Sequence, residues 1–255
     1  MSETTTAGVS VESAGPVRVI VLQRPPLNII DISLVDELRK AFSEAARDAN
    51  TRVVVLRGEG KCFSAGAEVR DHLPGRVESL VKGFDDLVLE MEDSRFPIIA
   101  AVHGACLGGG CELALSADIA IASDDAVFGQ PEVKLGVFPP VAVARFPRWF
   151  GAKIAADIVL TGRKILAPEA RRLGLVSMVV PHDNLGQVAR SLATEIAEAG
   201  PEALALAKRL LRGARVGKDP LRQSEDVYLK ELMATSEPAE GLNAFLEKRK
   251  PAWQR

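Results

Sequence analysis

Two glutamates near a run of glycines are the residues whose types and spacing point most directly to chemistry. Glu112 comes just after Gly108-Gly109-Gly110, and Glu132 lies further along in a stretch of apolar and small residues. Burial and mutual repulsion raise the pKa of one carboxyl of such a pair, while N–H groups at a helix start keep the other ionised. Such a pair can activate a water molecule with one carboxylate and deliver a proton to carbon with the other.

Two bends of small residues accompany the glutamates. Ala65-Gly66-Ala67 and Gly108-Gly109-Gly110 each follow a predicted strand and precede helical sequence. Backbone N–H groups that converge from two separate segments are suited to bind a developing enolate oxygen. For the second bend alone, the alternative is a glycine-rich turn with a dipole-matched Glu112 and no chemistry. The sequence contains neither a P-loop nor a GxGxxG fingerprint after a strand.

The elements that must position these residues follow from the apolar pattern. Short apolar runs predict buried strands at 17–22, 52–57, 97–102, 119–122 and 176–180. Apolar residues at helical spacing predict helices over 34–45, 77–91, 111–115, 152–160 and 168–174. Ser33 and Asp36 resemble a capping box before the first helix, and residues 136–140 are predicted to form a loop.

This layout predicts an α/β fold over roughly the first three quarters of the chain and helices alone after that. Residues 1–15 are polar and acidic, which predicts a disordered tail rather than a signal peptide. We expect a core that carries the site over residues 16–195 and a helical C-terminal region over residues 196–255.

Composition excludes several classes of function. The chain has 255 residues and a net charge of −2, which gives no electrostatic reason to expect a nucleic acid or membrane partner. No apolar run reaches the roughly 18 residues that a transmembrane helix needs. The three cysteines form no CxxC and the three histidines are scattered, so we expect reduced core cysteines, a cytoplasmic protein and no metal site. The GxSxG elbow of serine hydrolases is also missing.

Several stretches together resemble the crotonase superfamily, the enoyl-CoA hydratases and isomerases. They run in order along nearly the whole chain: FSAGAEV (63–69), AAVHGACLGGGCELALSADI (100–119), FGQPEVKLGVFP (128–139), LTGRKILAPEARRLGLV (160–176) and FLEKRKPAW (245–253). The resemblance implies a spiral core of stacked ββα turns, a C-terminal helical oligomerisation region, and a homotrimer or a dimer of trimers. The implied substrate is an acyl-CoA thioester, with CoA as part of the substrate and no separate cofactor.

The resemblance also implies roles for individual residues. Ala67 and Gly109 would donate the two oxyanion-hole N–H groups to the thioester carbonyl, and Glu112 and Glu132 match the two catalytic glutamates of the hydratases. Which glutamate is acid and which is base stays open, because the two titrate as a coupled pair. The positions that fall along the substrate and CoA path are Pro26, Leu27, Ala65, Gly66, Arg70, Gly108, Phe138, Phe245 and Lys248.

For some residues a structural role is the alternative. Arg70 and Lys248 could be solvated or ion-paired helix charges. Asp118 is expected to be a structural cap, and His103 a satisfied loop or core side chain.

The sequence departs from the common hydratase pattern after Glu132. The family has a proline followed by several glycines there, whereas this chain has Val137-Phe138-Pro139-Pro140 and then VAVA. Proline and branched residues stiffen this segment and take up volume beside the acyl pocket. Together with GAEVRDHLP (66–74), the stretch is similar to cyclohexa-1,5-diene-1-carbonyl-CoA hydratases of aromatic degradation. Both 1,2- and 1,4-addition of water to such a ring remain open. Alternatives are an enoyl-CoA isomerase or ring hydrolase of the same fold, and an acyl-CoA-binding scaffold without catalysis.

Overall fold

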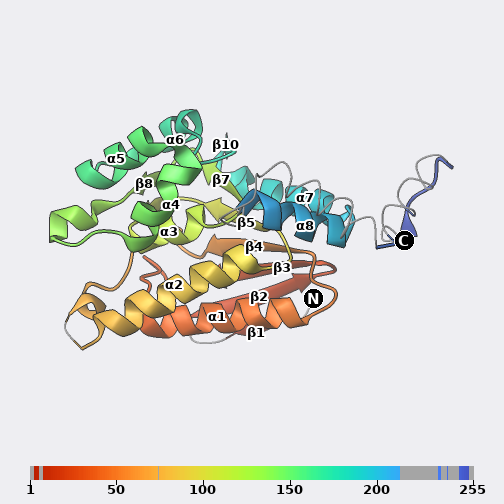
Figure 1. Ribbon diagram of the computed structural model, residues 1–255, viewed down its shortest axis with the longest axis horizontal. Coiled ribbons are helices and arrows are strands. Elements are labelled where there is room, and N and C mark those ends of the chain that lie inside the picture. Colours follow the sequence, from red (N-terminus) through yellow and green to blue (C-terminus); the bar gives the residue numbers. More distant parts are fainter. Residues whose placement is uncertain are drawn as a thin grey trace, which may run out of the picture.

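The computed structural model describes residues 3–5, 8–73, 75–212, 235–236, 240 and 247–252. Its strands form a seven-stranded sheet, ordered β1-β2-β3-β4-β5-β7-β10, and a three-stranded sheet, ordered β6-β8-β9 (Figure 1). The long sheet comprises β1 (Glu3–Thr5), β2 (Val9–Ala14), β3 (Val17–Leu22), β4 (Val53–Gly58), β5 (Ile98–Val102), β7 (Ile119–Ser123) and β10 (Met178–Val180). The short sheet comprises β6 (Ala105–Leu107), β8 (Val127–Gly129) and β9 (Ile165–Leu166).

The helices cover both faces of the long sheet. They are α1 (Ile32–Arg47), α2 (Val77–Asp93), α3 (Gly109–Leu115), α4 (Pro140–Phe150), α5 (Ala152–Thr161), α6 (Ala167–Leu173), α7 (Leu185–Ala197) and α8 (Pro201–Arg212). Three 3₁₀ helices also lie in the described part: η1 (Val69–His72), η2 (Pro131–Leu135) and η3 (His182–Asn184). None of the described helices is both long and apolar enough to cross a membrane.

The same order of elements recurs along the chain. From β3 to β10 the neighbouring strands of the long sheet run parallel. β5 leads into β6 of the short sheet and then into α3, and β7 leads into β8 and then into η2. After β4, Ser64 bridges Cys106 of β6 and so takes the place of a short strand. Each turn therefore delivers a bend and a helix start to the same side of the molecule.

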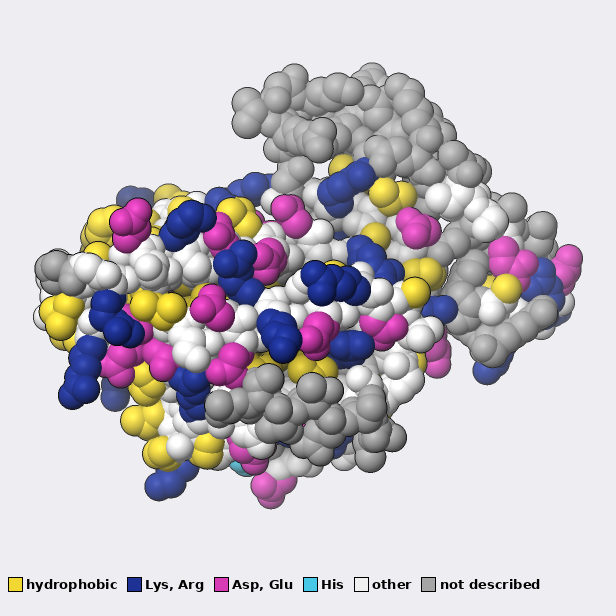
Figure 2. Space-filling view, turned by 90° about the horizontal axis from the view of Figure 1, so that it is seen from below, with side chains coloured by type: hydrophobic (Ala, Val, Ile, Leu, Met, Phe, Trp, Pro, Cys, Tyr) yellow, Lys and Arg dark blue, Asp and Glu magenta, His cyan; other side chains and the backbone are white. Residues whose placement is uncertain are grey.

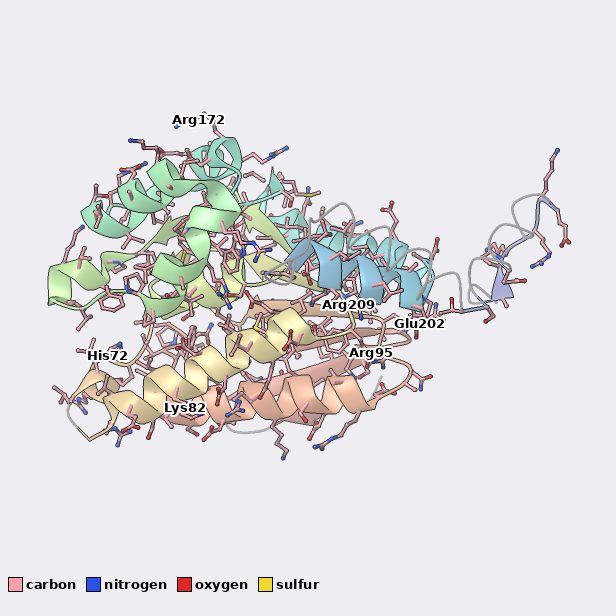
Figure 3. The ribbon with its side chains drawn as sticks, in the orientation of Figure 1. His72, Lys82, Arg95, Arg172, Glu202 and Arg209 are labelled. Carbon is pink, nitrogen blue, oxygen red and sulfur yellow. The ribbon has the colours of Figure 1, made fainter. Side chains whose placement is uncertain are left out.

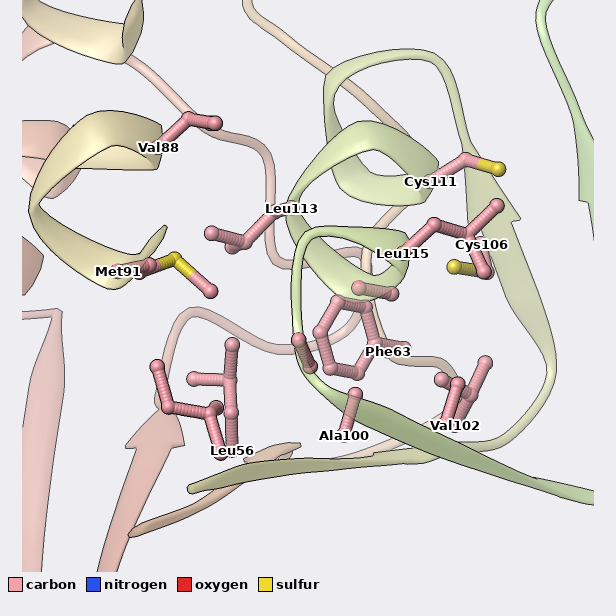
Figure 4. Close-up of a cluster of buried hydrophobic side chains, with 14 of the residues drawn as sticks. Leu56, Phe63, Val88, Met91, Ala100, Val102, Cys106, Cys111, Leu113 and Leu115 are labelled. Atoms are coloured by element: carbon pink, nitrogen blue, oxygen red, sulfur yellow. The ribbon is translucent and has the colours of Figure 1, made fainter. Parts of the chain in front are cut away.

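Successive side chains of each strand point to opposite faces of the long sheet, so the core has two parts. In β4, Val54 and Leu56 pack toward α1, α2 and α3, whereas Val53 and Val55 pack toward α7. Figure 4 shows Leu113 and Leu115 of α3 over side chains of β4 and β5. Side chains buried on both faces explain why these strands read as continuous apolar runs. The three cysteines are free and buried in this core, as predicted.

Four predictions about the elements and their boundaries differ from the structure. Residues 9–14 are not a disordered tail, since β2 pairs with β3 along its whole length. The loop predicted over residues 136–140 ends one residue earlier, because Pro140 begins α4; proline is well suited to the first position of a helix, where it gives up no hydrogen bond. Asp31, rather than Ser33, caps α1 by accepting the Leu34 N–H. The boundary predicted at residue 195 falls inside α7.

A buried lysine fixes α8 against the core. Lys208 is 4% exposed, and its Nζ donates to the carbonyls of Met91 and Phe96 at 2.9 Å and lies 2.9 Å from Asp118. Asp118 accepts the Ile98 N–H, which agrees with the predicted structural cap. On the face drawn in Figure 2, basic and acidic side chains are mixed, without a surface of one charge.

Candidate active site

A cavity of about 340 Å³ lies among α2, α3, η2 and the start of α4. Both predicted bends and both predicted glutamates line it. The structure thus brings together eight of the predicted site residues: Ala65, Gly66, Ala67, Gly108, Gly109, Glu112, Glu132 and Phe138. Segments that are far apart in the sequence meet here because successive turns of the fold place their bends side by side.

The two bends present backbone N–H groups without acceptors. The Gly66 carbonyl accepts the Ile30 N–H, and the Glu68 N–H donates to the Ile30 carbonyl. Ala67 lies between these two residues, and its N–H takes no part in the pairing with Ile30. Gly109 begins α3, where the N–H has no partner within the helix. A Cβ on Gly109 would lie 3.4 Å from the Ala67 Cβ and 3.6 Å from its nitrogen. Within the described residues neither N–H has a hydrogen-bond acceptor, and the two lie close enough to share one oxygen.

Gly108 allows Glu132 to lie against the glycine bend. Its φ of +50° and ψ of −129° are disfavoured for residues with a Cβ, and a Cβ there would come within 2.5 Å of the Glu132 Oε1. We expect Gly108→Ala to lower kcat by about 100-fold, because it displaces the carboxylate. Steady-state kinetics tests this, with Gly174→Ala as the control. Gly174 also has a positive φ, but nothing lies within 4 Å of a Cβ there. A Gly108→Ala enzyme as active as the control would contradict this role.

Glu112 is buried in α3 against the first turn of α4. It is 3% exposed, and its Oε1 accepts the Ala142 N–H at 2.8 Å. Burial raises the pKa of Glu112 to about 8; the Ala142 N–H opposes this rise and the nearby charge of Glu132 adds to it. The first turn of α4, whose first residue was predicted to lie in a loop, therefore supplies a hydrogen bond that holds this carboxyl in place.

Glu132 lies in η2 and is held by a neighbour that the sequence did not single out. Burial raises the pKa of Glu132 to about 7, opposed by its own backbone N–H. The Gln130 side chain is fully buried. With its amide nitrogen turned toward Glu132, Gln130 donates to both carboxylate oxygens at 3.1 Å. Gln130 thereby fixes the orientation of the Glu132 carboxylate.

The two carboxyls together can exchange a proton near neutral pH. Burial raises both pKa values, to about 8 for Glu112 and about 7 for Glu132, so the pair retains a proton near neutral pH. One member can then accept a proton from water while the other donates one, which is the division that general acid–base chemistry needs.

The raised pKa values also predict how stability depends on pH. Glu112 binds its proton more tightly in the folded state than at the ordinary pKa of 4.5. Its favourable contribution is therefore fully present below about pH 4.5 and is lost as the pH rises through about 8. We expect the melting temperature of Glu112→Gln, relative to the wild type, to rise between pH 5 and pH 9. Thermal melts across this range test the prediction; a difference that stays constant or falls would contradict it.

Other predicted residues lie elsewhere. Pro26, Leu27, Arg70 and Lys248 do not line the cavity, and Phe245 lies outside the described residues. The Leu27 carbonyl accepts the Ala65 N–H at 2.9 Å, so this loop supports the first bend from behind. Arg70 is exposed on η1.

Sequence reasoning missed three polar residues at the site: Gln130, His72 and Asp85. His72 and Asp85 line the cavity, and the His72 Nδ1 lies 3.0 Å from the Glu68 carbonyl oxygen. Figure 3 shows His72 just before the start of α2. The predicted structural role of His103 agrees with its position: it is 8% exposed, with Nε2 3.1 Å from the Gly60 carbonyl oxygen.

Comparison with known proteins places this geometry in a family. The family model described as enoyl-CoA hydratase/isomerase matches residues 12–255. The cyclohexa-1,5-dienecarbonyl-CoA hydratase of Thauera aromatica is 39% identical over 96% of both chains. The short-chain-enoyl-CoA hydratase of Clostridium acetobutylicum is 36% identical over 95% of both. The solved enoyl-CoA hydratase of Bacillus anthracis superposes with a TM-score of 0.90 at 34% identity, covering 97% of this chain and 99% of that one. The predicted α/β crotonase fold is thereby confirmed.

Proposed function

The chain belongs to the enoyl-CoA hydratase/isomerase family, and from this premise we propose that it hydrates a cyclic dienoyl-CoA of the cyclohexa-1,5-diene-1-carbonyl type. The general activity is that of an enoyl-CoA hydratase, a hydro-lyase that acts on an α,β-unsaturated acyl-CoA thioester. The finer choice of substrate, and a place in aromatic degradation, are part of the proposal.

The observation that carries the proposed substrate is the wall of the cavity after Glu132. Val137, Phe138, Pro139 and Pro140 line it, where the common family pattern has glycines. These side chains have few rotatable bonds and present a stiff apolar surface, which suits a flat ring better than a flexible chain. The identity with the Thauera aromatica hydratase supports the same substrate class.

In the proposed mechanism, the thioester oxygen accepts hydrogen bonds from the N–H groups of Ala67 and Gly109. A carboxylate of the Glu112–Glu132 pair takes a proton from water as the hydroxide oxygen bonds to the β-carbon. The electrons of the double bond move onto the thioester oxygen, where the two N–H groups stabilise the enolate. Protonation of carbon then completes the addition of one water. In a straight-chain substrate the proton comes from the other member of the pair.

Turnover of two acyl-CoAs, followed by mass spectrometry, tests this function. We expect purified protein to add one water to cyclohexa-1,5-diene-1-carbonyl-CoA with a kcat/KM well above that for crotonyl-CoA. The reverse preference would overturn the cyclic substrate but keep the hydratase activity. A shifted double bond without a gain in mass would instead favour the isomerase of the same fold.

We also propose a cytoplasmic location and a homotrimer or dimer of trimers. Three free, buried cysteines support a reducing compartment. The oligomeric state follows from the family resemblance, and light scattering on the purified chain would test it.

A further inference from the structure

Asp85 is a carboxyl on the inward face of α2. Helical spacing places it on the same face as Val81, Phe84 and Val88. Phe84 and Val88 are 6% and 3% exposed, and Asp85 itself is half-buried at the wall of the cavity. Asp85 therefore lies at the edge of the buried face of α2, in line with Glu78 and Glu92 seven residues away on either side, and at Asp85 this edge meets the cavity.

Among the described residues, no direct hydrogen bond or ion pair explains this carboxyl. Within the described residues the Asp85 side chain has no hydrogen bond or ion pair, whereas its neighbour Asp86 pairs with Lys82 at 3.1 Å and Arg39 at 3.7 Å. Lys82 is labelled on α2 in Figure 3. Glu92, further along α2, is paired with Arg145 at 2.9 Å. Taking an unpaired carboxylate out of water destabilises a fold, so its presence at the site favours a functional role.

Asp85 and the two glutamates face the cavity from different elements. Asp85 comes from α2, Glu112 from α3 and Glu132 from η2. Figure 1 shows α2 on one side of the site, with α3 and α4 on the other. The charge of Asp85 contributes to the raised pKa of Glu112, so the two carboxyls are within electrostatic reach. Burial raises the pKa of Asp85, the charge of Asp86 raises it further, and Arg145 opposes both.

A ring with two conjugated double bonds needs an acid in a different position from a straight chain. After the hydroxide oxygen bonds to the β-carbon, the electron pair spreads over the thioester oxygen, the α-carbon and the far carbon of the second double bond. Protonation of that remote carbon leaves the remaining double bond conjugated with the thioester. The remote carbon lies across the six-membered ring from the carbon that receives the hydroxyl, so the water-activating carboxyl is badly placed to reach it.

We propose that the Asp85 carboxylic acid delivers the proton to this remote ring carbon. The assignment rests on the proposed cyclic substrate. Water loses a proton to the Glu112–Glu132 pair and its oxygen bonds to the β-carbon. The enolate electron pair then forms a C–H bond with the Asp85 proton, and Asp85 becomes a carboxylate. Between turnovers the extra proton on the glutamate pair returns to Asp85 through solvent, so that one water has been added and no other reactant is consumed.

Asp85→Asn, with Asp86→Asn as the matched control, tests the assignment in deuterium oxide. We expect Asp85→Asn to lower the ratio of ring hydration to crotonyl-CoA hydration by about 100-fold, as for the loss of a general acid. Asp86→Asn should keep the wild-type ratio, and Asp85→Glu should recover part of it. The wild-type product should carry deuterium on the remote ring carbon by NMR. The melting temperature of Asp85→Asn should not fall, because no partner is lost.

The outcomes separate this assignment from the proposed function. A wild-type protein that does not hydrate the ring overturns the cyclic substrate, and the role of Asp85 with it. Ring hydration by Asp85→Asn at the wild-type ratio overturns the role of Asp85 alone. Deuterium on the α-carbon of the wild-type product, in place of the remote ring carbon, would likewise overturn the role of Asp85 alone.

Discussion

Glu112→Gln and Glu132→Gln are each expected to lower kcat by about 10²- to 10⁴-fold while KM changes little. Glutamine has nearly the same shape, and at position 112 its carbonyl oxygen can still accept the Ala142 N–H that now binds Glu112 at 2.8 Å. The substitution therefore removes proton transfer and leaves the cavity in place. Because the contribution of each carboxyl is made mainly in the transition state, the loss should appear in kcat.

Steady-state kinetics on crotonyl-CoA, for which the pair supplies both the base and the acid, measures this effect, and Glu78→Gln is the control because Glu78 is exposed on the first turn of α2. The double variant should be little worse than the poorer single variant, since the two carboxyls act as a unit. Near-native turnover by either single variant would exclude a mechanism that needs both.

Lys208→Met is expected to give the largest loss of stability, about 3 kcal/mol in the free energy of unfolding. The substitution keeps the length of the side chain but removes the ammonium group between the carbonyls of Met91 and Phe96 and the carboxylate of Asp118. This loss lies at the low end of the range expected when a buried ion pair loses one partner, because Arg212 still lies 2.9 Å from Asp118.

Urea denaturation measures this loss. Lys153→Met, at an exposed position on α5, is the control and should change the unfolding free energy by less than about 0.5 kcal/mol. A loss below about 1 kcal/mol for Lys208→Met would show that the fixation of α8 does not depend on its ammonium group.

The sequence predicted those parts of the fold that depend on local pattern. The runs at 52–57 and 97–102 are buried strands because both faces of the sheet are covered, and this leaves a continuous apolar signal. The bend at Gly108 was equally visible, because the backbone there needs a residue without a Cβ. Ala67 and Gly109 were expected to lie together through the family resemblance, and the stacked turns of the fold bring them together.

The features that could not be predicted from the sequence depend on contacts between distant segments. Pro139-Pro140 suggested a loop, although a proline can equally begin a helix, as Pro140 does in α4. The strand over residues 9–14 includes the polar residues Ser10, Glu12 and Ser13, and it contributes only Val9 and Val11 to the apolar core. Asp85 is one of three acidic residues at seven-residue spacing along α2, so only the cavity distinguishes it from Glu78 and Glu92. The role of Gln130 depends on the position of the Glu132 carboxylate and could not be derived from spacing.

Turnover in water labelled with oxygen-18, followed by mass spectrometry of the acyl-CoA, tests most directly whether Glu112 and Glu132 together add water to the substrate. The wild type should convert crotonyl-CoA, on which the pair supplies both the base and the acid, to a product that has gained one labelled water, while neither glutamine variant forms appreciable product in the same time. A product of unchanged mass, or labelled product formed by either variant at the wild-type rate, would contradict the two-carboxylate mechanism.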